Sequence, residues 1–72
     1  MQILSLEGRE FIQLCDLLKR VGLCETGGHA KMVIAEGLVK VDGKVELRKR
    51  CKIRAGQIVE FEGQKAKVSP EK

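Results

Sequence analysis

The chain has 72 residues, and its 14 Lys and Arg side chains outnumber its 10 Asp and Glu side chains, giving a formal net charge of +4 at pH 7. A chain of this length buries only about 60% of its unfolded surface and leaves no room for a catalytic domain beside a binding domain. We therefore expect one domain over residues 1–72. No apolar run approaches the roughly 20 residues of a membrane span, and the first residues lack a secretory signal, which predicts a cytoplasmic protein without a membrane partner.

Aromatic residues are scarce, because the chain has no Trp, no Tyr and only Phe11 and Phe61. Proteins that bind single-stranded nucleic acid stack bases on several exposed aromatic rings. We expect both Phe side chains to lie in the core. If the basic charge serves a nucleic acid, the predicted contacts are therefore to its backbone and shape.

Hydrophobic periodicity predicts two helices in the first half of the chain. The first covers residues 10–21 and ends at Gly22, with an apolar stripe of Phe11, Leu14, Cys15, Leu18 and Val21. The second follows Thr26, whose hydroxyl can cap a helix N-terminus, and ends near Gly37. Its predicted apolar positions are Ala30, Val33 and Ile34.

From residue 38 the hydrophobic period changes from 3.6 to 2, which predicts short strands. Asp42-Gly43 is typical of a hairpin turn between two strands, with Val45 and Leu47 continuing the apolar side. Cys51 and Ile53 are predicted to point inward on the next strand, and a last hairpin turns at Gly63-Gln64. Residues 3–6 could add a short edge strand, and 69–72 are expected to fray.

The predicted fold class is therefore α+β. Two N-terminal helices pack on a small, twisted, mainly antiparallel sheet of four to five short strands. The motif core is expected over residues 10–62.

Positive charge is concentrated in one part of the chain. Residues 30–54 contain eight Lys and Arg against three Asp and Glu and carry a net charge of +5, whereas the remainder carries −1. If Cys51 and Ile53 point inward, Arg50, Lys52 and Arg54 point outward together. A basic stripe of this kind is typical of nucleic-acid binding, although a solvated strand face has the same composition.

The order of motifs resembles the alpha-L RNA-binding domain of the ribosomal small-subunit protein S-four type, and within it the short, free-standing YbcJ/YaaA group. The resemblance covers about two-thirds of the chain. It rests on Leu14-Cys15-Asp16-Leu17-Leu18, Gly22, Thr26-Gly27-Gly28-His29-Ala30-Lys31, Gly37, Val39-Lys40-Val41-Asp42-Gly43 and Ile53-Arg54-Ala55-Gly56-Gln57-Ile58. Many members have Arg where this chain has Gly27, so the contact expected from that Arg is missing here.

The resemblance implies a protein that binds structured RNA of the rRNA or tRNA type, and we expect it to be a monomer. Ribosome assembly, with ribosomal particles as partners, and RNA modification are the implied processes. The residue chemistry agrees, since the glycines at the start of the second helix leave backbone N–H groups open to a phosphate. The predicted RNA-binding residues are Thr26, Gly27, Gly28, His29, Lys31, Lys40, Lys44, Arg48, Lys49, Arg50, Lys52 and Arg54.

Three other functions compete with RNA binding for these residues. Cys15, Cys24, His29 and Cys51 lack the close pairs of a structural zinc site, and Cys15 and Cys51 fall at predicted buried positions, so no metal or cofactor is expected. Cys24 with His29 lacks an orienting third group and a pocket for a small-molecule substrate, so the protein is not expected to be an enzyme. The remaining alternative is a protein–protein adaptor that uses the same basic face on an acidic partner.

Overall fold

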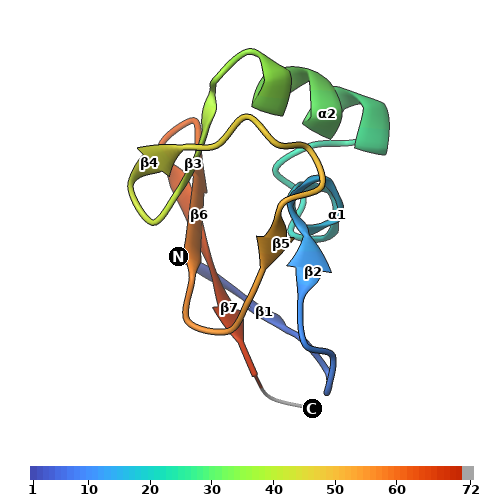
Figure 1. The fold of residues 1–72 in the computed structure, drawn as a ribbon, viewed down its shortest axis with the longest axis vertical. Helices are drawn as coiled ribbons and strands as arrows, with labels where there is room; N and C mark the ends of the chain where they lie inside the picture. The colour runs from blue at the N-terminus through green and yellow to red at the C-terminus, as the bar shows by residue number, and fades with distance from the viewer. Residues whose placement is uncertain (71–72) are drawn as a thin grey trace.

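The computed structural model describes residues 1–70 as two helices and seven strands (Figure 1). The helices are α1 (Leu14–Arg20) and α2 (Gly27–Ala35). The strands are β1 (Gln2–Ser5), β2 (Ile12–Gln13), β3 (Val39–Val41), β4 (Lys44–Val45), β5 (Lys52–Ile53), β6 (Ile58–Phe61) and β7 (Gln64–Ser69). The fold is α+β as predicted, but the helices are not N-terminal, because β1 and β2 precede them.

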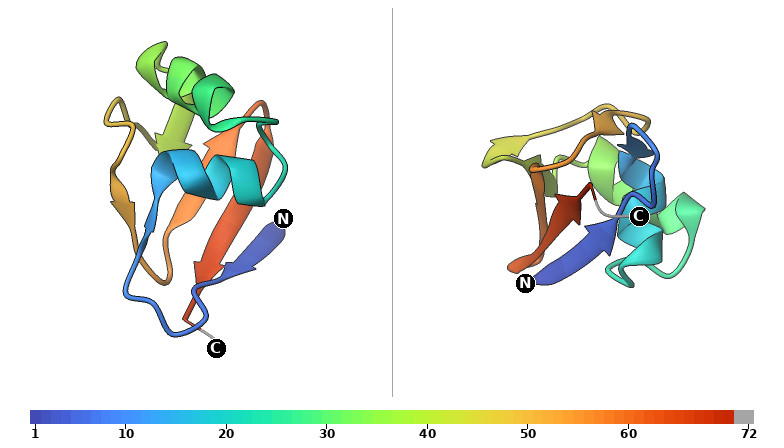
Figure 2. Two further views of the ribbon diagram at one scale, coloured as in Figure 1. Left: turned by 90° about the vertical axis from the view of Figure 1, so that its right-hand side faces the viewer. Right: turned by 90° about the horizontal axis from the view of Figure 1, so that it is seen from below.

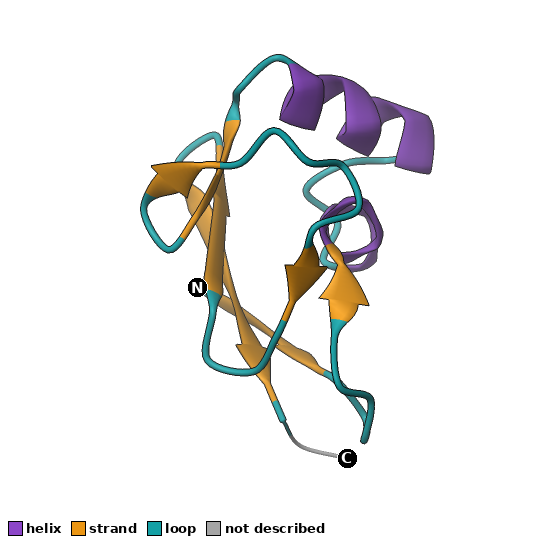
Figure 3. Cartoon of the chain, viewed as in Figure 1, coloured by secondary structure: helices purple, strands orange, loops and turns teal. Residues whose placement is uncertain are grey.

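The strands form two separate sheets. One has the order β1-β7-β6-β3-β4, in which β1 runs parallel to β7 and the other neighbours are antiparallel. The other consists of β2 and β5 alone, paired antiparallel. In Figure 3, α2 crosses the top of the molecule, and α1 lies below it and continues directly from β2. Neither helix in residues 1–70 is long and apolar enough to cross a membrane.

The first helix starts later than the sequence predicts, because Ile12 and Gln13 are extended and pair with β5. Gln13 makes no side-chain cap at the start of α1. Instead, the N–H groups of Leu14 and Cys15 donate to the carbonyl oxygens of Cys51 and Lys49, at 2.9 and 3.1 Å. A loop distant in sequence thus satisfies two of the N–H groups that a helix leaves open at its start.

The second helix starts where the sequence predicts. The hydroxyl oxygen of Thr26 accepts a hydrogen bond from the His29 N–H at 3.0 Å, which is an ordinary N-cap. Gly37 follows the helix with a φ of 78°, a left-handed conformation that favours glycine.

The predicted β3–β4 hairpin is present, with Asp42 and Gly43 at φ values of 51° and 84°. The inward orientation predicted for Val45 and Leu47 is wrong, since they are 53% and 59% exposed. Strand β4 ends at Val45, so the alternation does not continue to Leu47. Both side chains instead lie close to the backbone of Gly37.

The last hairpin, β6–β7, turns at Glu62 and Gly63, one residue earlier than predicted. Ser69 ends β7 and its carbonyl accepts from the Leu6 N–H, so the sheet extends to a residue at which fraying is expected. Residues 71–72 of the expected frayed tail lie outside the described residues.

The core lies between the helices and the two sheets and is wholly apolar among residues 1–70. Its largest fully buried side chains are Leu14, Leu17, Leu18, Ile34, Ile53, Val39, Val59 and Val68. Phe61 is 3% exposed, as predicted. Phe11 is only half-buried, so its expected place in the core is wrong.

Candidate nucleic-acid interface

Five cations gather on residues 48–54, which we call the basic segment. They are Arg48, Lys49, Arg50, Lys52 and Arg54, and all are exposed. The segment follows β4, passes the start of α1 and enters β5 (Figure 2). The hydrogen bonds that Lys49 and Cys51 accept from the first turn of α1 fix it against the helix.

The alternation on β5 is as the sequence predicts. Ile53 is fully buried, whereas Lys52 and Arg54 on either side of it point outward. Cys51 departs from the prediction, since its side chain is partly exposed at the edge of the core. The cause is local, because β5 begins only at Lys52 and Cys51 still belongs to the loop.

An aromatic ring that the sequence interpretation placed in the core lies beside these cations. The Lys52 Nζ is 4.9 Å from the centroid of the Phe11 ring, and the Arg54 Cζ is 5.9 Å from it, both within the range of a cation–π contact. The sequence carries no alternating pattern that marks this position, because Phe11 and Ile12 are both apolar. The helical periodicity of the following residues instead places Phe11 on the apolar stripe of the predicted helix.

Arg48 differs from the other cations because a carboxylate binds its guanidinium. Its Nε and Nη2 donate to Glu46 Oε2 and Oε1 at 3.0 and 3.1 Å, and its backbone N–H also donates to Oε2. Hydrogen bonds from Arg48 lower the pKa of Glu46 to about 2, and the pair raises the pKa of Arg48. Arg48 is therefore engaged within the chain.

The thiol of Cys51 completes this cluster. Its Sγ lies 3.5 Å from Glu46 Oε1 and 3.6 Å from Arg48 Nη2. Burial, followed by the hydrogen bond to Glu46, raises the pKa of Cys51. Arg48, Arg50, Cys51 and Lys52 line a surface hollow of about 400 Å³. Since Glu46 offsets the charge of Arg48, Arg50 and Lys52 are the cations of this hollow that suit an anionic group.

A second carboxylate supports the other end of the basic segment without contacting a cation. Asp42 accepts from the Ile58 N–H at 3.0 Å and from the Gln57 side-chain amide at 3.2 Å. The Gln57 carbonyl oxygen in turn accepts from the backbone N–H of Arg54 at 2.7 Å. The position of Arg54 is thereby linked to the turn of the β3–β4 hairpin while its guanidinium stays exposed.

Lys40 and Lys44 lie on that hairpin, and both are exposed. Lys40 pairs in register with Glu60 on β6 and Val45 on β4, so a carboxylate faces it across the sheet. Lys44 stands at the start of β4, next to the turn.

The remaining predicted residues lie at the opposite end of α1 from the basic segment (Figure 2). They are Thr26, Gly27, Gly28, His29 and Lys31, at the start of α2. Residues 23 and 24, which lead to them, donate to the Leu18 carbonyl near the C-terminal end of α1, whereas Lys49 and Cys51 contact its N-terminal end. A seven-residue helix is about 10 Å long, so the structure does not bring the two groups together.

Cys15 and Cys24 are buried, and burial followed by the charge of Glu62 raises the pKa of Cys24. Among residues 1–70, no three His, Cys, Asp or Glu side chains are grouped so that they could hold a metal ion.

Comparison with known proteins places this arrangement in a family. The S4 domain family matches residues 4–69, almost the whole chain. The chain belongs to the S4 domain family. This S4 domain is 56% identical over 68 residues to YbcJ of Escherichia coli (strain K12), whose name provisionally describes it as an RNA-binding protein, and the alignment covers 94% of this chain and 97% of YbcJ. YbcJ of Shigella flexneri matches to the same extent.

Solved structures share the fold of this S4 domain. The solution structure of E. coli YbcJ, described as having an alpha-L motif involved in RNA-binding, aligns with a TM-score of 0.75 at 55% identity over 96% of this chain and 87% of its own. The 30S ribosomal protein S4e of Thermoplasma acidophilum aligns with a TM-score of 0.65 at 26% identity over 79% of this chain and 30% of its own. The resemblance inferred from the sequence motifs is thereby confirmed.

Proposed function

We propose that this S4 domain protein binds structured RNA of the rRNA or tRNA type, chiefly through phosphate contacts from the basic segment. The observation that carries the proposal is the gathering of exposed cations on β5 and the loop before it, in a chain 56% identical to a protein named for RNA binding. Exposed cations at fixed spacing recognise the backbone and shape of a folded RNA.

The proposed contacts divide into two groups. The principal group is Lys49, Arg50, Lys52 and Arg54. Arg48 contributes less to RNA binding, because Glu46 binds its guanidinium. Lys40 and Lys44 extend this group along the β3–β4 hairpin. The second group, Thr26, Gly27, Gly28, His29 and Lys31 at the start of α2, contacts a separate part of the same RNA, because α1 separates the groups.

We further propose a cytoplasmic, monomeric protein without catalytic activity or cofactor. Ribosome assembly, with ribosomal particles as partners, and RNA modification are the processes that its similarity to an alpha-L structure and a ribosomal protein favours. The domain is proposed to extend over residues 1–72.

A titration of a structured RNA fragment at several salt concentrations tests the proposal. Three to five phosphate contacts predict a slope of about −2 to −4.5 in a plot of log affinity against log salt concentration. A flat dependence would contradict the assignment of the basic segment as the contact surface.

An adaptor that binds an acidic protein would show the same sensitivity to salt. A pulldown of the tagged protein from cell extract, with and without ribonuclease, separates the two functions. Partners lost after ribonuclease treatment support RNA binding, whereas partners retained after it support the adaptor.

A further inference from the structure

Phe11 is the aromatic ring that the surface presents. The chain has only two Phe residues and no Tyr or Trp, and Phe61 is buried in the core. Phe11 directly precedes β2 and is half-buried. An aromatic ring that is partly exposed beside cations is an environment in which proteins stack nucleic-acid bases.

The pairing of β2 with β5 determines what surrounds this ring. Ile12 lies opposite Ile53, and both are buried, while Gln13 lies opposite Lys52. Because side chains alternate along a strand, Phe11 and Gln13 share the outer face with Lys52 and Arg54. This face therefore presents one ring, one amide and two cations, the side-chain types that bind a base face, a base edge and phosphates.

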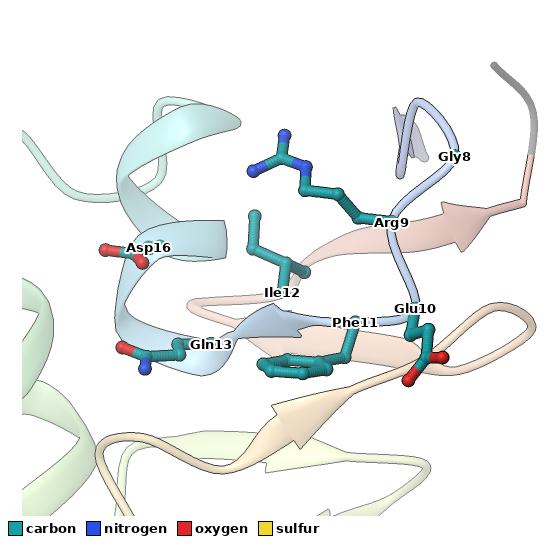
Figure 4. Close-up of a pocket in the computed structure, with 7 residues that line it drawn as sticks. All are labelled: Gly8, Arg9, Glu10, Phe11, Ile12, Gln13 and Asp16. Atoms are coloured by element: carbon teal, nitrogen blue, oxygen red, sulfur yellow. The ribbon is translucent and has the colours of Figure 1, made fainter.

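Two hollows adjoin this face, and their charges differ. One, of about 600 Å³, is lined in part by Glu10, Phe11, Gln13 and Asp16. Figure 4 shows the Phe11 ring and the Arg9 guanidinium extending from opposite sides of the segment that borders it. Its two carboxylates oppose the one cation, Arg9, so the hollow does not favour a phosphate.

The other hollow, of about 400 Å³, is the one lined by Arg48, Arg50, Cys51 and Lys52. Lys52 connects the two, since it lines the cationic hollow and its Nζ lies 4.9 Å from the Phe11 ring. Electrostatics therefore orient a bound nucleotide, with its phosphate toward Arg50 and Lys52 and its base toward Phe11.

We infer that Phe11 stacks one unpaired base of the bound RNA, while Lys52 and Arg50 hold the adjoining phosphate. The inference rests on the proposed RNA-binding function and deepens it by naming the ligand. Stacking of a base is stronger than an exposed cation–π contact, so a base can displace the Lys52 ammonium from the ring onto a phosphate. A single ring accommodates a single base, so the ligand is an RNA stem with an unpaired nucleotide beside it.

The test uses three synthetic RNA hairpins with the same stem. The first carries one bulged nucleotide, the second carries an abasic nucleotide at the bulge, and the third is fully paired. The wild-type protein should bind the first about 5- to 100-fold more tightly than the second, because these two differ only in the base. Phe11→Leu, which keeps an apolar side chain beside the core, should remove this preference and leave the affinity for the abasic and paired hairpins unchanged.

Phe11→Trp supplies a direct optical readout. The chain has no Trp, so the introduced indole is the only one, and a base stacked on it quenches its fluorescence. The bulged hairpin should quench the emission, whereas the abasic hairpin should not. Circular dichroism of both variants verifies the fold.

The outcomes separate this inference from the proposed function. Tight, salt-dependent binding of all three hairpins alike, with no quenching, overturns the stacking inference and leaves RNA binding in place. Binding to none of the hairpins overturns both. Equal weakening of all three hairpins by Phe11→Leu also overturns the inference, because it makes Phe11 a support for the cations only.

Discussion

Arg48 and Arg54 stand at the two ends of the basic segment, and a carboxylate supports each end in a different way. At the first end, Glu46 binds the Arg48 guanidinium directly through two hydrogen bonds. At the second end, Asp42 binds the side chain of Gln57, and Gln57 binds the backbone N–H and carbonyl of Arg54. The first carboxylate offsets a charge, whereas the second positions a residue and leaves its charge available.

The comparison shows that net charge counted along a sequence does not give the charge available to a ligand. Glu46 and Asp42 each subtract one charge from the total of the region. Only Glu46 subtracts it from a cation of the basic segment, since Asp42 is engaged with an amide and a backbone N–H. The Phe11 ring likewise contacts Lys52 and Arg54 without offsetting their charge.

The largest expected effect comes from Arg50→Ala combined with Lys52→Ala, which removes two unpaired cations from the middle of the segment. The salt dependence of RNA binding should weaken by about 1.5 units of slope, and the affinity should fall. The fold should persist, because exposed charges add little stability. The measurement is a binding titration at several salt concentrations, with circular dichroism for each variant.

Lys65→Ala combined with Lys67→Ala is the matched control, since it removes two exposed cations from β7. This control should change the slope far less. Equal effects of the two double variants would mean that the RNA responds to net charge alone.

The next-largest expected effect is a difference in salt slope between variants at the two ends of the basic segment. Arg54→Ala should reduce the salt slope by about 0.8, the value for one phosphate contact. Arg48→Ala should reduce it by much less, because Glu46 already offsets the Arg48 charge. Titrations of both single variants with the same RNA check the difference. A larger effect of Arg48→Ala would reverse the comparison.

A smaller effect is expected from the carboxylate that positions Arg54. Asp42→Ala removes the acceptor of two hydrogen bonds and should lower the free energy of unfolding by about 1–2 kcal/mol. Asp42→Asn should cost less, because it keeps one acceptor oxygen and tolerates the φ of 51°. Urea unfolding of both variants measures this, and equal losses would contradict the stabilising roles of the acceptor oxygens and of the tolerated φ.

The second helix, the Asp42-Gly43 turn and the outward cations of β5 could be predicted because each depends on local chemistry. Thr26 caps the helix with its own hydroxyl, and the alternation around Ile53 follows from the period of a strand. The start of the first helix could not be predicted in the same way. Phe11 fits a helical stripe, and only the pairing of β2 with the distant β5 makes these residues extended.

In the candidate site, too, the features set by local chemistry could be predicted and those set by contacts distant in sequence could not. The sequence identifies the cations of residues 48–54 but not the ring beside them, since Phe11 reaches the surface only through that pairing. It also treats Arg48 as equal to Arg50, because the Glu46 contact depends on the path of a loop. The sequence also groups the start of α2 with the basic segment as RNA-binding residues, but it does not show that α1 separates them.

The Glu46–Arg48 pair should make the stability of the fold depend on pH, an effect smaller than those on RNA binding. The folded-state pKa of Glu46 is lowered to about 2, so the stability it contributes is present above its ordinary pKa near 4.5 and is lost as the pH falls toward 2. Glu46→Gln should remove this component from a plot of stability against pH. Thermal unfolding between pH 6 and pH 2 measures it, with Glu25→Gln as a control that leaves Arg48 untouched. Parallel curves for wild type and Glu46→Gln would contradict the pairing.

The smallest expected effect concerns the thiol at the first end of the segment. Cys51 is partly exposed while Cys15 and Cys24 are buried, so Cys51 should react first with a thiol reagent under native conditions. Burial and the hydrogen bond to Glu46 raise its pKa, which keeps the thiolate fraction low at pH 8. Glu46→Gln removes the negative charge and should therefore lower the pKa and increase the labelling rate severalfold. Mass spectrometry of time-resolved labelling identifies the site, and the Glu25→Gln variant should label at the wild-type rate. If Glu46→Gln leaves the Cys51 rate unchanged, Glu46 does not act on the thiol, and its role at this end is confined to Arg48.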